Sequence, residues 1–450
     1  MVNHSIIQKS QLEGALRIDP EYYQPEYLNK EKKLRLISTN ELDEIASITD
    51  GEHGSPIWDE NSGIKYFSAQ HVKDGFIDGL DTKTISTIID KRNVRSRLAE
   101  GDILLSTVGT IGNAGIVTKD LLPANIDRHV ARITLKKNTL DPEFLVTFLN
   151  SKYGKFQSIR ESTGNVQLNL FIDKIKTLLV PKKNNSEISE LIKKSFQLRQ
   201  ASEVFYQQAE ELLLKELGLK NTVFEKELSY IVNFSDVKNA DRMDAEYFQP
   251  KYKKLIEKIR KQNAKNLGEF VSMRKGFEPG SEAYQEEGKL FIRVSSVSKL
   301  GIEEKDQKYL SEDLYRKLKK DYEPKLGDIL LTKDATPGIA YVIKEPLEGI
   351  ISGGILDLKV KNNIESEYLA LCISSIVGQW QAQRDAGGSI IAHWKPEQVK
   401  NLLIPSLPIQ RQKEIAELVR KSHETRKKSK ELLEQAKRKV EEMIRKDDGD

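Results

Sequence analysis

Cysteine is almost absent from this chain, since Cys372 is the only one in 450 residues. A lone cysteine can form no internal disulfide and cannot by itself build a zinc site, and the apolar run around Cys372 favours a small buried side chain. The six histidines include no i, i+4 pair, which argues against a metal hydrolase. We therefore expect neither a disulfide scaffold nor a metal centre.

Long apolar runs are also missing. No stretch reaches the ~18 apolar residues that a membrane-spanning helix needs, and residues 1–14 lack the apolar core of a signal peptide. The mean hydropathy of −0.52 agrees with a strongly polar chain. We expect a cytoplasmic protein that has no membrane partner.

A strong charge of one sign is absent too. Lys and Arg number 72 against 68 Asp and Glu, which leaves a net charge of only +4. A field this weak is a poor argument for nucleic-acid binding. Any such function must therefore rest on the local arrangement of residues.

The signatures of common catalytic sites are not found either. The chain has no Gly-x-x-x-x-Gly-Lys-[Ser/Thr] phosphate loop, no Asn-Pro-Pro-[Tyr/Phe] run typical of amino-methyltransferases and no strand followed by a glycine-rich dinucleotide loop. The glycine-rich residues 108–113 are better interpreted as a structural turn than as a phosphate-binding loop. The sequence thus gives no direct case for ATP hydrolysis or methyl transfer by this chain.

What the chain does contain is an internal repeat. Residues 17–27 and 242–252 are identical at seven of eleven positions, at an offset of 225. Further matches follow in the same order at offsets of 224–227: Gly-Asp-Ile-Leu-Leu at 101–105 and 327–331, Leu-Leu-[Val/Ile]-Pro at 178–181 and 402–405, and Glu-Ile-x-Glu-Leu from Glu187 and Glu414. Collinear matches with so little drift indicate a duplicated unit.

Each copy has the same internal order. Short alternating runs such as 64–69, 132–135 and 290–294 with glycines between them predict strands joined by loops. A helical segment is expected over 143–160 in the first copy and 366–384 in the second. A Val-Pro or Ile-Pro stop and a long polar helix follow. Each copy is thus predicted to be a mixed domain of roughly 150 residues with a trailing helix.

The two trailing helices carry matching heptad patterns, at an offset of 227. From 188 to 217 the chain has four Lys or Arg and five Glu, whereas 410–446 has thirteen Lys or Arg and seven Glu. Opposite charge favours pairing of the two helices with each other. The alternative is that each helix packs separately on its own domain. The predicted seam positions are Ile188, Leu191, Ser195, Leu198, Ser202, Phe205, Ala209 and Leu212, with Ile415, Leu418, Ser422, Thr425, Ser429, Leu432 and Ala436.

Over essentially its whole length, the chain resembles the specificity subunits of type I restriction-modification systems. The resemblance lies in the order and duplication of three segments: Arg-x-Asp-x-Glu-Tyr-[Tyr/Phe]-Gln-Pro-x-Tyr, Gly-Asp-Ile-Leu-Leu, and the glycine-containing stretches that begin at Gly164 and Gly387. It implies an α+β fold with two pseudo-repeated target-recognition domains, separated by two long helices that form an antiparallel coiled coil.

The same resemblance implies function and partners. Each target-recognition domain would read one half of a bipartite, asymmetric site in double-stranded DNA, and the helices would set the spacing. Two methyltransferase subunits would dock on the chain, and restriction subunits would join them. The chain itself would be non-catalytic and hold no cofactor, because S-adenosylmethionine, ATP and Mg²⁺ are expected on the partner subunits.

We accordingly expect five segments. They are an N-terminal segment with the first target-recognition domain (1–185), a central helix (186–218), a connector with the second target-recognition domain (219–406), a C-terminal helix (407–446) and a disordered tail (447–450).

Candidate DNA contacts are polar side chains on predicted loops and strand ends, because base edges are read by Arg, Lys, Asn and Gln and phosphates by many polar groups. Their frames match between the copies but their chemistry differs, as expected if the halves read different sequences. In the first copy they are His53, Ser68, Gln70, His71, Thr107, Thr110, Asn113, Arg128, His129, Asn165, Gln167 and Asn169. In the second copy they are Arg274, Lys275, Arg293, Ser295, Ser296, Lys333, Thr336, Ser389, His393 and Trp394.

The aromatic residues of the repeated Tyr-Gln-Pro segments could stack on bases. Their near-identity in both copies favours framework packing or partner docking instead, since base-reading residues are expected to diverge. These residues are Tyr22, Tyr23, Tyr27, Tyr247, Phe248 and Tyr252.

Two alternatives remain open at this point. Asp334, Asp357 and Lys359 faintly resemble the carboxylate-lysine pattern of a stand-alone nuclease, although Arg132 occupies the position of Asp357 in the other copy. The chain could also be the specificity subunit of a modification-only methyltransferase, which the sequence does not separate from a restriction system.

Overall fold

The computed structural model describes residues 4–15, 17–79, 82–164, 167–220, 222–224, 227, 229–303, 307–361, 364–387 and 392–446. They form two compact units, of which the first comprises residues 1–199 with 427–450 and the second residues 200–426. The predicted tail over 447–450 lies outside the described residues. No helix in the described ranges combines the length and apolar character needed to cross a bilayer.

The first unit contains a mixed module over residues 39–181, which we call the first module. Its main sheet has five strands in the order β2-β8-β5-β6-β4, and a second layer pairs β3 with β7 in parallel. The strands are β1 (Thr39–Glu41), β2 (Ala46–Asp50), β3 (Lys65–Phe67), β4 (Gly75–Phe76), β5 (Ile103–Ser106), β6 (Ala114–Ile116), β7 (Ala124–Ile126), β8 (Val130–Leu135) and β9 (Leu179–Pro181). The helices are α3 (Leu42–Ile45), α4 (Thr87–Arg92), α5 (Pro142–Asn150), α6 (Lys152–Glu161) and α7 (Ile172–Lys176), with the 3-10 turn η2 (Ala69–His71).

The second unit contains the second module, over residues 265–404. Its main sheet follows the order β11-β19-β16-β17, which matches β2-β8-β5-β6, and β12 pairs with β18 in parallel as β3 pairs with β7. The strands are β10 (Lys265–Asn266), β11 (Val271–Lys275), β12 (Lys289–Ile292), β13 (Val297–Ser298), β14 (Gly301–Ile302), β15 (Lys308–Leu310), β16 (Ile329–Thr332), β17 (Ala340–Val342), β18 (Gly349–Ile351), β19 (Ile355–Val360) and β20 (Leu403–Ile404). The helices are α11 (Leu267–Phe270), α12 (Glu312–Tyr322), α13 (Ser366–Ser374), α14 (Ile376–Asp385) and α15 (Pro396–Lys400), with the 3-10 turn η6 (Val294–Ser296). The predicted duplication and mixed fold class are confirmed.

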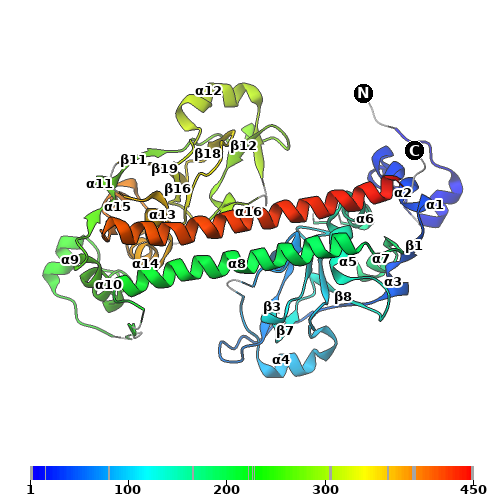
Figure 1. Ribbon diagram of the computed structural model, residues 1–450, viewed down its shortest axis with the longest axis horizontal. Coiled ribbons are helices and arrows are strands. Elements are labelled where there is room, and N and C mark those ends of the chain that lie inside the picture. Colours follow the sequence, from blue (N-terminus) through cyan, green and yellow to red (C-terminus); the bar gives the residue numbers. More distant parts are fainter. Residues whose placement is uncertain are drawn as a thin grey trace. The chain divides into compact units, whose positions relative to one another are not determined.

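The repeated Gly-Asp-Ile-Leu-Leu segment forms the central strand of each sheet. In β5, Ile103 and Leu105 face a core shared with α5, whereas Leu104 faces the smaller core under β3 and β7. In β16 the side chains alternate in the same way, and Leu330 packs in the core that includes Ile292 of β12. A strand that is covered on both faces needs apolar residues at every position, which explains the unbroken Ile-Leu-Leu run. Figure 1 shows the second module's sheet between α13 and the layer that contains β12.

The segments predicted to be helical over 143–160 and 366–384 are helical, and each consists of two helices, a division that was not predicted. The chain turns at Ser151 and at Ser375, which have extended backbone angles. The Ser151 hydroxyl accepts from the amides of Tyr153 and Gly154, and that of Ser375 accepts from the amide of Val377. These are N-caps, which start a new helix with a different direction.

Two long helices, α8 (Ser186–Glu216) and α16 (Ile409–Lys446), contribute to both units, and within each unit they pack against each other. In the first unit the Ser195 hydroxyl donates to the Ser429 carbonyl oxygen, and Ser429 donates back to Ser195, both at 2.8 Å. Lys439 pairs with Glu187 at 2.7 Å, so the chain directions are opposite. The predicted antiparallel pairing is confirmed in this unit.

The second unit shows the same helix pairing. The Ser422 hydroxyl donates to the Ser202 carbonyl oxygen at 2.7 Å, and the hydroxyl oxygens of the two serines lie 3.1 Å apart. Arg411 pairs with Glu216 at 3.5 Å. A serine hydroxyl is only one carbon away from its backbone. Short hydrogen bonds from these hydroxyls to the partner helix therefore require the two helix backbones to lie close together.

The buried stripe of each long helix is wider than the predicted heptad seam. Ser195 and Ser202 are buried as expected, but Leu198 is only half-buried. Ile192 and Tyr206, which lie outside the predicted seam, are buried instead and belong to the cores of the first and second modules. Each helix packs against both its partner helix and a module, so it needs a broader apolar stripe than a two-stranded coiled coil.

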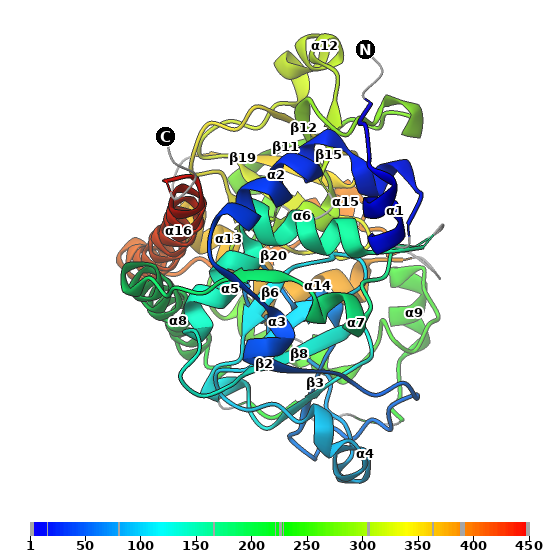
Figure 2. The ribbon, with the colours of Figure 1, turned by 90° about the vertical axis from the view of Figure 1, so that its right-hand side faces the viewer.

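The Tyr-Gln-Pro segment of the first unit contains the 3-10 turn η1 (Pro20–Tyr23) and helix α2 (Pro25–Leu36), which lies along α6 in Figure 2. The Tyr22 hydroxyl donates to Glu161 at 2.7 Å, and the Arg160 guanidinium lies 4.1 Å from the Tyr22 ring centroid. Arg17 donates to the Arg160 carbonyl oxygen at 3.1 Å, and Tyr27 stacks on Phe156.

The second unit repeats these contacts ahead of α10 (Pro250–Arg260). Arg242 donates to the Arg384 carbonyl oxygen at 3.1 Å and lies 4.7 Å from the Tyr247 ring centroid. Tyr252 meets Trp380 edge-on. The contacts support framework packing for these aromatic residues.

Candidate nucleic-acid interface

Loops of the first module meet at one end of its main sheet, where β5 ends and β8 begins. The Arg128 amide donates to the Glu52 carbonyl oxygen at 3.1 Å, and the Thr107 amide donates to the His129 carbonyl oxygen at 3.0 Å. The Thr107 carbonyl oxygen accepts from the Leu170 amide at 2.9 Å. These bonds join the loops that contain residues 51–54, 107–113, 127–129 and 163–170.

The second module repeats this backbone frame. The Gly353 amide donates to Phe277 at 2.8 Å, the Lys333 amide to Gly354 at 2.9 Å and the Trp394 amide to Lys333 at 2.8 Å. Each of these positions lies 224–226 residues after its counterpart in the first module. We call the two ends of the sheets that carry this frame the first and second loop faces.

Most of the predicted DNA-contacting residues of the first module lie on the first loop face. The Asp127 amide donates to the Phe67 carbonyl oxygen at 3.0 Å, which ties the turn η2 to the loop of Arg128 and His129. In η2, the Ser68 amide donates to the His71 ring at 2.9 Å, and burial lowers the pKa of His71. Gln70, in the same turn, is exposed.

Three of the predicted histidines are held by carboxylates. Asp50 and Asp127 were not selected from the sequence, whereas Asp334 was selected only for the nuclease alternative. His53 lies 2.6 Å from Asp50, and His129 lies 3.4 Å from Asp127. Their spacings of three and two residues are a signal that could have revealed both pairs. Burial raises the pKa of Asp127, and hydrogen bonds from His129 oppose this. The third pair, in the second module, joins residues 59 positions apart and has no local signal.

The remaining first-module candidates differ in exposure. Thr107 is buried, so its backbone, more than its side chain, shapes the loop face. Asn113 accepts a hydrogen bond from Lys155 and faces the carbonyl oxygen of Val72. Gln167 is exposed, and Asn169 donates to its carbonyl oxygen at 3.0 Å. Thr110 is half-buried at the tip of its turn, and Asn165 lies outside the described residues.

The second loop face has a different polar centre. The Asp334 carboxylate accepts from Lys333 at 2.5 Å and lies 2.8 Å from the His393 ring nitrogen Nδ1. Burial would raise the pKa of Asp334, but the hydrogen bonds from these two residues lower it. His393 is largely exposed, so this triad presents an imidazole to solvent.

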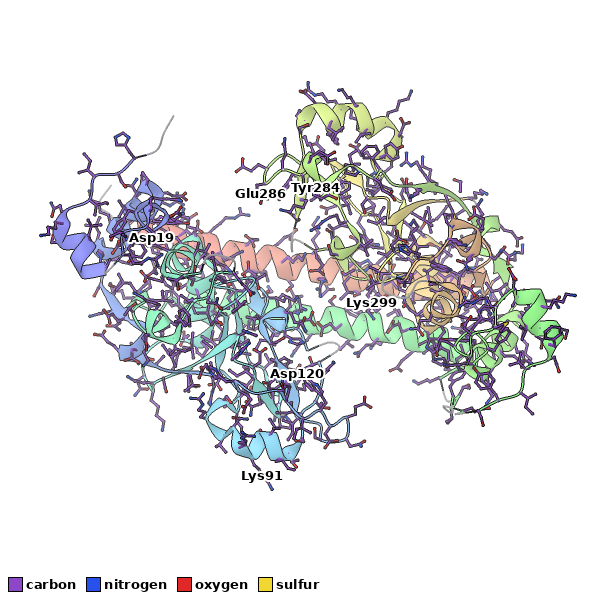
Figure 3. All side chains as sticks on the ribbon, turned by 180° about the vertical axis from the view of Figure 1, so that it is seen from behind. Asp19, Lys91, Asp120, Tyr284, Glu286 and Lys299 are labelled. Carbon is purple, nitrogen blue, oxygen red and sulfur yellow. The ribbon has the colours of Figure 1, made fainter. Side chains whose placement is uncertain are left out.

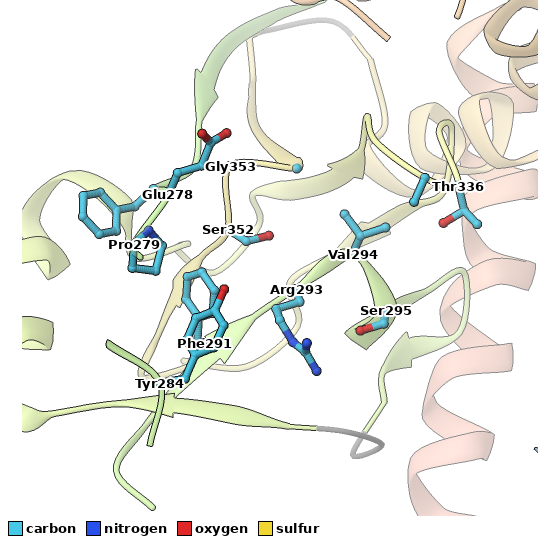
Figure 4. A pocket seen from close by; sticks show the side chains of 13 residues that line it. Glu278, Pro279, Tyr284, Phe291, Arg293, Val294, Ser295, Thr336, Ser352 and Gly353 are labelled. Carbon is cyan, nitrogen blue, oxygen red and sulfur yellow. The ribbon is translucent and has the colours of Figure 1, made fainter. Parts of the chain in front are cut away.

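Beside this triad lies a cleft of about 480 Å³, shown in Figure 4. The predicted residues Arg293, Ser295 and Thr336 line it together with aromatic rings that sequence reasoning did not select. These rings are Phe277, Tyr284 and Phe291. The Tyr284 side chain is over a third exposed, and its ring centroid lies 5.5 Å from that of Phe291. The cleft therefore combines flat apolar walls with cationic and hydroxyl groups.

Other predicted residues of the second module belong to the framework or pair with a residue that lines the cleft. Trp394 is 1% exposed within the main core, and Ser296 is fully buried. Arg274 pairs with Asp357 across β11 and β19. Lys275 is exposed and pairs with Glu278 at 2.8 Å. Ser389 lies outside the described residues.

The carboxylates of the nuclease alternative have other partners. Asp357 is fully buried beside Arg274, and burial together with the neighbouring Asp328 raises the pKa of Asp357 to about 6. Asp334 pairs instead with Lys333 and His393. Among the residues that the structure describes, no group of three or more His, Cys, Asp or Glu side chains is arranged to hold a metal ion.

The duplicated modules correspond to a family with a known role. A family model described as the type I restriction modification DNA specificity domain matches residues 39–203 and 260–438. The chain belongs to this family. Each matched segment contains one module and part of the long helix that follows it, so the chain carries two type I specificity domains.

Individual relatives of these type I specificity domains share less than 30% sequence identity with this chain. The type I restriction enzyme EcoBI specificity subunit of Escherichia coli is 27% identical over 217 residues, which is 48% of this chain and 45% of that protein. The match therefore spans about half the length of this curated relative.

Two solved structures are similar over most of the chain. The S subunit of a type I restriction-modification system from M. genitalium has 14% identity and a TM-score of 0.42, covering 91% of this chain and 95% of that one. The HsdS subunit from Thermoanaerobacter tengcongensis has 15% identity and a TM-score of 0.29, covering 91% and 97%.

Proposed function

We propose that each module reads one half of an asymmetric, bipartite site in double-stranded DNA through its loop face. The observation that carries this proposal is that one backbone frame, repeated bond for bond, presents different side chains in the two modules. Positions 127–129 are Asp-Arg-His in the first module, and the equivalent positions 352–354 are Ser-Gly-Gly in the second. A conserved frame with divergent polar groups is what two readers of different sequences require.

The two loop faces suit different base edges. Arg128 is exposed on the first face, and arginine donates well to the O6 and N7 acceptors of guanine in the major groove. On the second face, Arg293 lies beside the apolar walls of Phe277 and Tyr284. Such walls fit the methyl group of thymine next to a guanine. The predicted contacts of Asn165 and Ser389 stay part of this proposal.

The long helices would fix the gap between the half-sites. At a rise of about 1.5 Å per residue, the 31 residues of α8 extend about 46 Å, which exceeds one turn of DNA, about 34 Å. The serine contacts hold α8 and α16 close together, so helix length would translate into spacer length.

In the assembled enzyme, the duplicated chain would offer two equivalent docking surfaces to two methyltransferase subunits, and restriction subunits would join them in the cytoplasm. S-adenosylmethionine, ATP and Mg²⁺ would be held by those partners. The chain's own part would be to select the DNA sequence and not to carry out a reaction.

Exchange of one module tests the proposal. Residues 40–185 are replaced by the first module of another type I specificity subunit, and methylated positions are mapped across the host genome. We expect a split motif with a fixed gap in which only one half changes. A change in both halves would show that the modules do not read independently. A chain with the second module exchanged serves as the matched control and should alter the other half.

A further inference from the structure

Besides its core contacts with the long helices, each module places one short turn on the helix pair, which we call the docking turn. In the first module it comprises residues 72–77. Asp74 pairs with Lys437 of α16 at 2.8 Å, and the guanidinium of Arg199 on α8 lies 3.3 Å from the Phe76 ring centroid. A Cβ added to Gly75 would meet Leu433 at 2.8 Å, so the turn lies directly on α16.

In the second module the docking turn comprises residues 297–302. Here Lys299 pairs with Glu210 of α8 at 3.4 Å, and its ammonium group lies 4.7 Å from the Tyr206 ring centroid. The His423 ring nitrogen Nε2 of α16 lies 3.2 Å from the Lys299 carbonyl oxygen. Figure 3 shows Lys299 next to the long helices.

The two docking turns are equivalent, and so are the helix positions that they meet. Antiparallel pairing joins Val72 to Ile77 in the first turn and Val297 to Ile302 in the second, at an offset of 225. Asp74 therefore corresponds to Lys299. The offset of 227 between the long helices, which relates Ser195 to Ser422, makes Glu210 the counterpart of Lys437. The same contact occurs twice with its charges reversed.

The surroundings of the two ion pairs also differ in charge. In the first module the amine of Lys155, on α6, is largely buried near Asp74; burial lowers the pKa of Lys155 to about 8, and the negative charge of Asp74 opposes this shift. The equivalent residue on α14 is Gln379, which donates to Gly338 at 2.6 Å and carries no charge. A cation thus accompanies the acidic docking turn, and a neutral group replaces it where the docking turn is basic.

We propose that these reversed ion pairs form a charge code that assigns each module to its own stretch of the helix pair. If the modules changed places, Asp74 would face Glu210 and Lys299 would face Lys437. Only 14% of the Lys437 side chain is exposed, so solvent would screen a like charge there poorly. The code excludes the exchanged arrangement and holds whether or not the loop faces read DNA.

A two-by-two experiment on the full-length chain tests this code. One factor is module order, either natural or with residues 39–181 and 265–404 interchanged. The other is helix charge, either natural or reversed by K437E/E210K. In the natural order, we expect the reversal to lower the Tm by about 3–6 °C. In the interchanged order it should raise the Tm by a similar amount. A shift in the same direction in both orders would overturn the code.

A second series keeps the natural order, in case the interchanged chains do not fold. Adding D74K/K155Q/K299E to K437E/E210K should recover part of the lost Tm, because both pairs are then restored with reversed sign and K155Q removes the cation beside position 74. The repulsion between K437E and Glu434, which pairs with Lys437 in the natural chain, remains. A quintuple variant that is no more stable than the K437E/E210K variant would refute the code. E424K/K428E is the control, since it reverses two exposed charges of α16 without changing the net charge. It should leave the Tm almost unchanged.

Discussion

Replacing Ser202 tests whether the long helices are held at the close approach that their serines require. Ser202 and Ser422 are both fully buried, and the Ser422 hydroxyl reaches the backbone carbonyl of Ser202 at 2.7 Å. There is room for a small side chain only. Alanine removes the Ser202 hydroxyl but keeps the approach, whereas leucine adds atoms that must push α8 and α16 apart.

The structure sets the expected magnitudes. Ser202→Ala removes one hydroxyl contact and leaves the bond from Ser422 to the backbone, so it should cost about 1 kcal/mol. Ser202→Leu loses the same contact and overpacks the interface, which adds about 1–3 kcal/mol. The sum of about 2–4 kcal/mol corresponds to a Tm decrease of roughly 5–12 °C for a unit of this size.

Thermal unfolding followed by circular dichroism, with urea unfolding as a second measure, gives both values. Gln207→Leu places the same leucine on an exposed position of α8 and should change the free energy of unfolding by less than about 0.5 kcal/mol. If Ser202→Leu were no worse than Ser202→Ala, the helix backbones would not approach closely at this point. The proposal that the long helices fix the gap between the half-sites would then lose its physical basis.

Three further outcomes follow from other contacts. The pKa of Asp357 is raised to about 6, so the folded chain retains a proton that the unfolded chain loses near pH 4, and the free energy of unfolding should fall as pH rises from about 4 to 6. Asp328→Asn removes the neighbouring charge and should weaken this fall, as measured by urea titrations at each pH. An unchanged slope in this variant would contradict the prediction. Tyr22→Phe removes the hydrogen bond to Glu161 and should cost about 1 kcal/mol in the same assay without changing DNA sequence preference; altered preference would mean that Tyr22 reads DNA. Gly51→Ala would place a Cβ 2.0 Å from a backbone oxygen, so it should distort the first loop face. We expect DNA binding to weaken more than tenfold in a binding titration, and wild-type affinity would contradict the proposed role of this loop face.

Much of the architecture could be predicted because the two copies are collinear. The offset of 224–227 residues relates Leu104 to Leu330 and Ser195 to Ser422, and these pairs occupy equivalent places in the sheets and helices. The helix break at Ser151 was not predicted, because an apolar periodic segment continues through it. Only the extended backbone of Ser151 and its capping bonds reveal the turn.

The loop faces were predictable in part. Polar residues close to strand ends, such as His53 and Arg128, could be selected because strand ends converge in a sheet. The pairing of Asp334 with His393 joins distant loops, so no spacing in the sequence signals it. Trp394 was selected as a DNA contact, but its whole side chain is buried. Its polar ring nitrogen and its place in a glycine-rich region did not indicate this burial.

The most direct test of two independent reading surfaces is selection of bound sequences from a random DNA pool by the complex of this chain with the methyltransferase subunit that the proposed function assigns to it. Three versions are compared, namely wild type, His129→Ala on the first loop face and Arg293→Ala beside the cleft of the second. We expect each variant to relax base preference in one half-site, a different half for each, with the gap unchanged. A variant that relaxed both halves, or shifted the gap, would contradict separate reading by two modules on a fixed helical spacer.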